Sequence, residues 1–191
     1  MTPGPTPLAD RLERVPDRRL PVRYFVFGHL CLLTAFVALA VVPRSLAGFF
    51  YHPKMLAVVH LVTLGWITSS ILGALYMILP MALRSPLPAR RTDRWALWCF
   101  IIGVLGVVSH FWIDESNGMV WSAAMVLLAL AAVGWRVLGR LAAGKAPVEH
   151  RVPFYLAFGN IVLAGLLGAL IGIDKLSLIH HLTLPTSSVM G

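Results

Sequence analysis

His60 is the residue whose type and position most clearly indicate chemistry. It lies inside an apolar run, Met55 to Leu83, that contains no Asp, Glu, Lys or Arg. An imidazole in hydrocarbon is costly unless it is paired, hydrated or bound to a metal, and such residues are usually functional. We therefore predict that His60 is a ligand. The alternative that stays open is a histidine bonded to a neighbouring helix.

The other histidines and the two cysteines are weaker candidates. His110 ends a later apolar run at a depth similar to that of His60, so it is an alternative metal ligand, although a solvated helix end is the simpler interpretation. His29 lies near the opposite membrane face. Cys31 and Cys99 both fall in apolar runs, and we interpret them as small core residues rather than as a disulfide or a metal pair.

The run that contains His60 is predicted to be a helix that crosses a membrane. A bilayer core needs about 20 apolar residues in a helix, and this run is longer, with Pro80 at its inner boundary. At about 100° per residue, the small residues Gly65, Ser69 and Gly73 form a stripe opposite the histidine, which lets a neighbouring helix come close. An apolar wall is expected beneath the imidazole, made of Ile67, Ile71, Ala74 and Ile78.

A ligating imidazole also needs a partner for its other ring nitrogen, because that bond fixes the tautomer and the orientation of the ring. For His60 the candidates are Thr63, one turn further on, and a backbone carbonyl from an adjacent helix. Both stay open at this point.

The composition is that of an integral membrane protein. Hydrophobic residues make up 58% of the chain and charged residues 13%, whereas about a quarter of the residues in a soluble domain are charged. The predicted fold is an all-α, polytopic transmembrane helix bundle of five spans, at 24–42, 55–80, 95–112, 119–138 and 152–173. The lipid bilayer is therefore a partner. The net charge of +8 comes from connections between spans, so no nucleic-acid binding is expected.

The charged connections also predict the orientation of the bundle. Arginines gather in the N-terminal tail, in the connection after the second span and around Arg136 and Arg140, which we interpret as marking the connection after the fourth span. The turn at Asp114 and Glu115 is acidic. Because positively charged connections stay in the cytoplasm, the N-terminus is expected to be cytoplasmic and His60 to lie near the outer face.

Three regions follow from this pattern. Residues 1–21 are a cytoplasmic Pro- and Arg-rich tail, and residues 22–175 are the helix bundle. The string from Leu176 to Thr186, LSLIHHLTLPT, is also the translation of a transposon-end sequencing adapter with one extra base. We therefore interpret residues 176–191 as a non-native, adapter-derived tail without a metal motif. A genuine polar tail outside the membrane is the alternative.

The second span resembles a known family. The pattern His60-Leu-Val-Thr-Leu-Gly-Trp66, followed by Gly73-Ala-Leu-Tyr-Met-Ile-Leu-Pro80, is similar to the haem–copper oxidase (cytochrome c oxidase) subunit I superfamily. Within it, the pattern is closest to divergent bacterial members whose spans begin HxxxLGW and close in GxxYxxLP. The resemblance covers about residues 22–175, which matches the N-terminal part of such a subunit.

The resemblance implies a membrane haem protein of the bacterial cytoplasmic membrane that takes part in respiratory electron transfer to oxygen or nitric oxide, alongside other helices or subunits of a respiratory complex. It implies that His60 is an axial ligand of a low-spin, b-type haem. The second axial ligand, the high-spin haem ligand and the copper ligands belong to later spans of the family that this chain lacks. Oxidoreductase activity is thus implied for a full-length protein, and no catalytic residue is assigned. The alternative is a haem-free membrane scaffold, or an assembly or nitric-oxide-tolerance protein, on the same helices.

Overall fold

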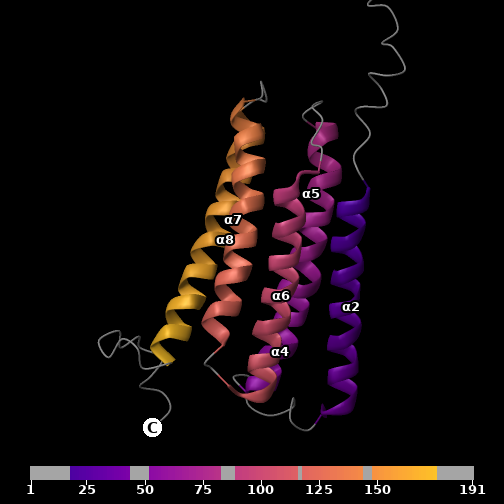
Figure 1. The fold of residues 1–191 in the computed structure, drawn as a ribbon, viewed down its shortest axis with the longest axis vertical. Coiled ribbons are helices and arrows are strands. Elements are labelled where there is room, and N and C mark those ends of the chain that lie inside the picture. The colour runs from indigo at the N-terminus through magenta and orange to yellow at the C-terminus, as the bar shows by residue number, and fades with distance from the viewer. Residues whose placement is uncertain (1–17, 44–51, 83–88, 116–117, 144–147, 176–191) are drawn as a thin grey trace, which may run out of the picture.

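The computed structural model describes residues 18–43, 52–82, 89–115, 118–143 and 148–175, and every element in these ranges is a helix (Figure 1). Residues 1–17 of the predicted tail and the adapter-like residues 176–191 lie outside this description. In chain order the elements are α2 (Arg19–Val41), α4 (Pro53–His60), η1 (Leu61–Thr68), α5 (Ser69–Ala82), α6 (Arg91–Ile113), α7 (Met119–Ala143) and α8 (Val148–Lys175).

Five helices are long and apolar enough to cross a membrane, which confirms the predicted all-α bundle of five spans. The second span runs without a break from α4 through η1 into α5. The helices extend beyond the apolar runs because hydropathy marks only the part of a helix that suits lipid, whereas the helix continues until its terminal backbone groups find partners. At the end of α6, for example, Asp114 adopts a left-handed conformation with φ of 57° and ends the helix.

The spans stand side by side, with α2 at one edge of the bundle and α8 at the other (Figure 1). α2 packs on η1 and α5, α4 packs on α6, α6 packs on α7, and α7 packs on α8. In α8 only 6% of the apolar window is buried, against 28–33% in the other four spans. Within the described chain, α8 is therefore covered by α7 alone.

The two ends of the bundle differ in charge. The arginine-rich end, where α2, α6 and α8 begin, carries Arg18, Arg19, Arg90, Arg91 and Arg140. The histidine end, where α4 and α7 begin, carries His60, His110, Asp114 and Glu115.

The middle of the second span is wound as a π-helix, η1, which begins at the residue after His60. The wider turn is seen at Thr68, whose Oγ1 donates to the carbonyl oxygen of Thr63, five residues earlier, at 2.9 Å. Gly65 lies within η1 and touches α2, because a Cβ atom at Gly65 would stand 2.5 Å from Cβ of Cys31. π-Helical turns are rare and often occur at functional sites.

The small-residue stripe of the second span faces a neighbouring helix, as predicted. Gly65 and Gly73 are buried, and Ser69 is completely buried. On α2, Gly28 fits against this stripe, since a Cβ atom there would lie 3.1 Å from Cβ of Ser69. The stripe therefore brings the backbones of α2 and the second span close together.

The predicted wall beneath His60 is wrong. Ile67, Ile71 and Ile78 are 42–56% exposed, and neither they nor Ala74 line the cavity that His60 lines. The prediction assumes α-helical turns throughout, whereas the wider turns of η1 rotate every later side chain of the span relative to His60.

Candidate ligand site at His60

His60 lies at the junction of α4 and η1, where a backbone carbonyl and an aromatic ring hold its imidazole. Its Nδ1 is 2.7 Å from the carbonyl oxygen of Leu56, one turn earlier. A carbonyl oxygen only accepts, so Nδ1 carries the proton and Nε2 keeps its lone pair. The imidazole also stacks on the ring of Phe111 from α6, with centroids 4.8 Å apart and planes 28° apart. With a proton on Nδ1 alone, the imidazole of His60 is neutral, which is the form in which imidazole binds metals.

The partner of Nδ1, the ring nitrogen that would not bind the metal, differs from both candidates that the sequence offers. Thr63 does not serve, because its hydroxyl donates to the carbonyl oxygen of Val59 at 2.8 Å. The carbonyl that accepts from His60 belongs to Leu56 on the same helix rather than to an adjacent one. A helical histidine can thus fix its own tautomer without help from another span.

His60 lines a cavity of about 310 Å³ between the second span, α6, α7 and α8. Small residues of α8, Ala164, Gly165 and Gly168, form part of its wall, together with apolar side chains of α6 and α7 such as Val107 and Met119. The hydroxyl groups of the two lining threonines already donate to backbone carbonyls of their own helix. An apolar cavity with one convergent polar group is the usual form of a small-molecule or cofactor site.

His29 shows which of these features is distinctive. Its Nδ1 lies 2.7 Å from the carbonyl oxygen of Phe25, the same arrangement as in His60. His29 is exposed, however, and does not line the cavity. The bond to the preceding turn is therefore a common property of a helical histidine, and the cavity is what sets His60 apart.

His110, the alternative ligand, lies one residue before Phe111 on α6 but does not line the same cavity. Its ring packs so closely on Gly118 that there is no room for a Cβ atom at that position. Its Nδ1 is buried and has no hydrogen-bond partner among the described residues. The structure thus places both histidines at the histidine end, as expected, and brings only His60 to the cavity.

A buried carboxylate that the sequence pattern does not single out lies at the arginine-rich end. Asp93 of α6 is 2% exposed. Its carboxylate accepts from the hydroxyl of Tyr76 on α5 at 3.0 Å and from the backbone N–H of Arg90 at 2.7 Å. It also forms an ion pair with Arg136 of α7. Three helices are therefore joined through one carboxylate.

Aromatic rings cover this cluster. Tyr24 of α2 stacks on Tyr76, with ring centroids 6.1 Å apart and planes 14° apart. It also contacts the ring of Phe100 of α6, with ring centroids again 6.1 Å apart. The hydroxyl of Tyr24 is buried and has no hydrogen-bond partner among the described residues. The cluster thus extends from α2 to α7.

The interpretation of Arg136 as a connection residue is wrong, because it lies inside α7 with a side chain that is 10% exposed. The signal is present in the sequence: Arg136 interrupts the apolar stretch AAVGWRVLG. A charged residue inside a span almost always has a buried partner. Asp93 is harder to find, since it stands among the arginines that begin α6.

Comparison of the chain with protein families, curated proteins and solved structures finds no match. Among the described residues there is no group of three or more His, Cys, Asp or Glu side chains that would hold a metal ion by itself. What the site offers is a single oriented imidazole at an apolar cavity.

Proposed function

We propose that this chain is a membrane protein that binds a haem through His60, and that the bound haem passes electrons in a respiratory reaction with oxygen or nitric oxide. The observation that carries the proposal is that the imidazole of His60 meets an apolar cavity with its Nδ1 proton given to Leu56 and its Nε2 available to a metal.

The surrounding residues fit an axial haem ligand. A bond from Nδ1 to a carbonyl orients the ring and raises its basicity as a ligand. The apolar lining would keep water from a bound metal and would influence its reduction potential. The cavity is near the lower end of the range for ligand sites, about 300–1,000 Å³, so a whole macrocycle requires α8 to move outward. We expect α8 to do so more easily than the other spans, because α7 alone covers it in the described chain.

A haem in this cavity would supply one-electron chemistry, and the residues of the chain would hold it, orient it and exclude water. His60 would provide one ligand to it through Nε2. Because the ring of His110 packs on Gly118 outside the cavity, the described chain offers one imidazole and not two. The chain by itself is therefore expected to bind haem weakly, with incomplete six-coordination.

Titration with haemin in mild detergent tests the proposal. The wild type should show a saturable shift of the Soret band, and His60→Ala should abolish it. His29→Ala is the matched control, because His29 makes the same backbone bond but lies outside the cavity. Equal binding by the wild type and His60→Ala would remove His60 as the ligand. A third variant, His110→Ala, should leave the affinity unchanged unless His110 swings in as the second ligand.

A haem-free membrane scaffold is the second candidate function. The cluster around Asp93 favours it, because the partners of this carboxylate all belong to the protein and tie α5, α6 and α7 together. Absence of any Soret shift in the folded wild-type protein would put this function first.

We also propose that the arginine-rich end lies in the cytoplasm of a bacterium. The exposed Arg90, Arg91 and Arg94 at this end support it, as do the exposed Asp114 and Glu115 at the other end. Reporter fusions at Asp114 decide it: a periplasmic reporter should be active there, and activity of a cytoplasmic reporter alone would reverse the orientation.

A further inference from the structure

α8 carries a row of exposed residues at the spacing of a coiled coil. Its members recur at intervals of four, three, four and three residues along the helix. This alternation is the heptad pattern by which two helices interlock along a seam. The members of this row, which we call the α8 seam, are Leu156, Asn160, Leu163, Leu167 and Leu170. The four leucines are 41–61% exposed, so the seam has the pattern of a helix contact and no described helix on it.

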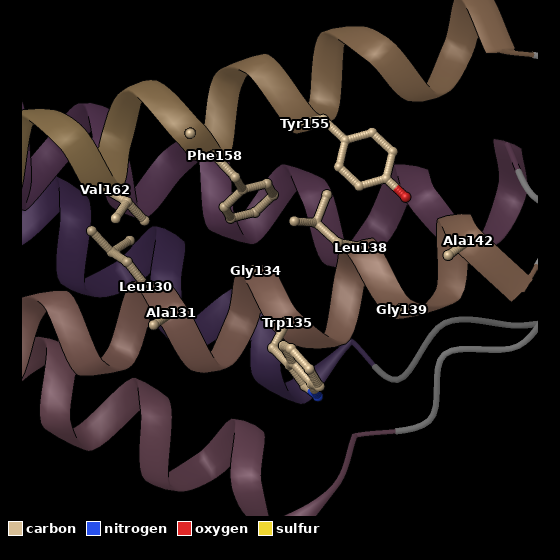
Figure 2. A pocket seen from close by; sticks show the side chains of 11 residues that line it. Leu130, Ala131, Gly134, Trp135, Leu138, Gly139, Ala142, Tyr155, Phe158 and Val162 are labelled. Carbon is tan, nitrogen blue, oxygen red and sulfur yellow. The ribbon is translucent and has the colours of Figure 1, made fainter.

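The α8 seam lies on the side of α8 that faces away from α7. Phe158 and Val162 point from α8 towards α7, where Phe158 packs over Gly134 (Figure 2). At about 100° per residue, Phe158 is about 200° from Asn160 around the helix. No seam residue lines the His60 cavity or the hollow of about 610 Å³ between α7 and α8 (Figure 2). The seam is therefore a third face of α8, separate from both cavities.

Asn160 places an amide on this face at the middle of a membrane span. It lies near the centre of the apolar window Arg151–Gly168 and is exposed. One N–H of its side chain donates to the carbonyl oxygen of Leu56's counterpart in α8, Leu156, at 2.9 Å. A carboxamide has a second N–H and an oxygen that accepts, and no described residue bonds to either. Acyl chains offer no hydrogen bond, so the amide favours a polar partner from another helix.

We propose that the α8 seam binds the α8 seam of a second copy of this chain, in a parallel dimer whose two Asn160 amides hydrogen-bond to each other. Copies of one chain insert into a membrane in the same orientation, so their α8 helices run in the same direction. A twofold axis along the membrane normal then sets each seam residue opposite its counterpart. An amide both donates and accepts, so it is complementary to an identical amide. One Asn at an a position, with leucines at the d positions, fixes the register of paired parallel helices.

Other occupants match the α8 seam less well. Lipid would cover the leucines but would leave the amide of Asn160 without a partner. An unrelated helix would need a polar group at the same depth, whereas a second copy supplies one by symmetry. The two preceding heptad positions hold Pro153 and the exposed Glu149, so the contact is expected to begin at Leu156, beyond the point where two carboxylates would meet.

Disulfide cross-linking of the chain in phosphatidylcholine vesicles tests the geometry of the contact. Leu163→Cys places a thiol on the seam and should give a covalent dimer with a mild oxidant. Val162→Cys is the matched control, because it lies at the same depth but about 100° around the helix, on the side that faces α7. The wild type should not cross-link, since Cys31 is buried and Cys99 is half-buried. Equal cross-linking of the two variants, or none in either, would overturn the proposal.

The amide is tested by energy transfer between donor- and acceptor-labelled copies, as the vesicles are diluted with phosphatidylcholine. Asn160→Leu keeps the apolar seam but should weaken dimerisation about tenfold. Thr34→Val is the matched control. Thr34 is an exposed polar residue of α2 whose hydroxyl donates to the preceding turn, at Leu30, but it lies off the seam. Its substitution should leave dimerisation unchanged.

Two results of the dilution experiment would overturn the proposal. One is a wild type that stays monomeric, which would leave the seam to lipid or to a different helix. The other is an Asn160→Leu variant that dimerises as tightly as the wild type, or no more weakly than Thr34→Val. Asn160 and Thr34 are both exposed, so neither substitution disturbs the core, and circular dichroism checks that each variant is folded.

Discussion

Asp93 at the arginine-rich end and His60 at the histidine end differ in what their partners leave unused. At the arginine-rich end, the carboxylate of Asp93 receives a hydroxyl, a backbone N–H and a guanidinium. At the histidine end, the Nδ1–H of His60 donates a hydrogen bond to the carbonyl oxygen of Leu56, and no described residue bonds to Nε2. Polar groups whose hydrogen bonds and charges are all met by the protein, as at Asp93, need no ligand to explain their burial. A group with an unused nitrogen at a cavity needs a ligand to explain it.

This contrast predicts opposite responses to substitution. Damage at Asp93 should appear as lost stability, because a buried charge would be left without its partner. Damage at His60 should appear as lost binding, with little change in stability.

Asp93→Asn should destabilise the protein most. The substitution keeps the size of the side chain but removes the carboxylate that forms an ion pair with the guanidinium of Arg136, and breaking a buried ion pair in this way costs roughly 3–5 kcal/mol. Denaturant unfolding in detergent, followed by circular dichroism, measures the change. The double variant Asp93→Asn/Arg136→Met should recover much of the loss, since no unpaired charge remains. A single variant as stable as the wild type would show that Arg136 reaches water or lipid headgroups instead.

Tyr76→Phe should cost less, roughly 1.5–3 kcal/mol, the range for a hydrogen bond to a charged group. Tyr24→Phe is its matched control. The two rings stack on each other, but the hydroxyl of Tyr24 has no partner among the described residues, so its removal should leave stability unchanged or raise it. Equal losses in the two variants would mean that the stacked rings, and not the carboxylate, hold this end together. The same unfolding experiment distinguishes these results.

Gly65→Ala and Gly139→Ala should shift stability in opposite directions. At Gly65 the new methyl group meets Cβ of Cys31, and such overpacking costs about 1–3 kcal/mol. At Gly139 it meets nothing, so the better helix propensity of Ala should stabilise by about 0.5–1 kcal/mol. Cys31→Gly should rescue Gly65→Ala. If both alanines stabilise, α2 does not press on η1 as described.

These residues also show which features of the fold can be predicted from the sequence. Long apolar runs predict the five spans, and the small-residue stripe predicts close packing on a neighbour, because both depend on composition and on a regular helical period. The π-helix is not visible in this way, because a regular helical period assumes α-helical turns throughout the span. The predicted isoleucine wall is therefore wrong. The pairing of Asp93 with Arg136 is also not predicted, because the two residues are far apart in the chain. When charged residues are assigned from sequence alone, they are assigned to the connections between spans.

The histidine is predictable for a different reason. Its identity and depth make His60 a candidate in the sequence, but only the packing of four spans shows that it meets a cavity, while His29, with the same local bond, does not. The sequence therefore supplies the list of candidates, and the tertiary structure selects among them.

His60→Phe should change stability little while abolishing the haemin response. The substitution keeps an aromatic ring to stack on Phe111, and it removes one neutral hydrogen bond to a backbone carbonyl, worth about 0.5–1.5 kcal/mol. The carbonyl of Leu56 retains its place in the helix, so no charged group is left unpaired. Unfolding of the haem-free protein should thus resemble that of the wild type, and the Soret shift on haemin addition should disappear. A loss of stability as large as that of Asp93→Asn, without haem, would make His60 a structural residue and would remove the difference between the two ends of the bundle.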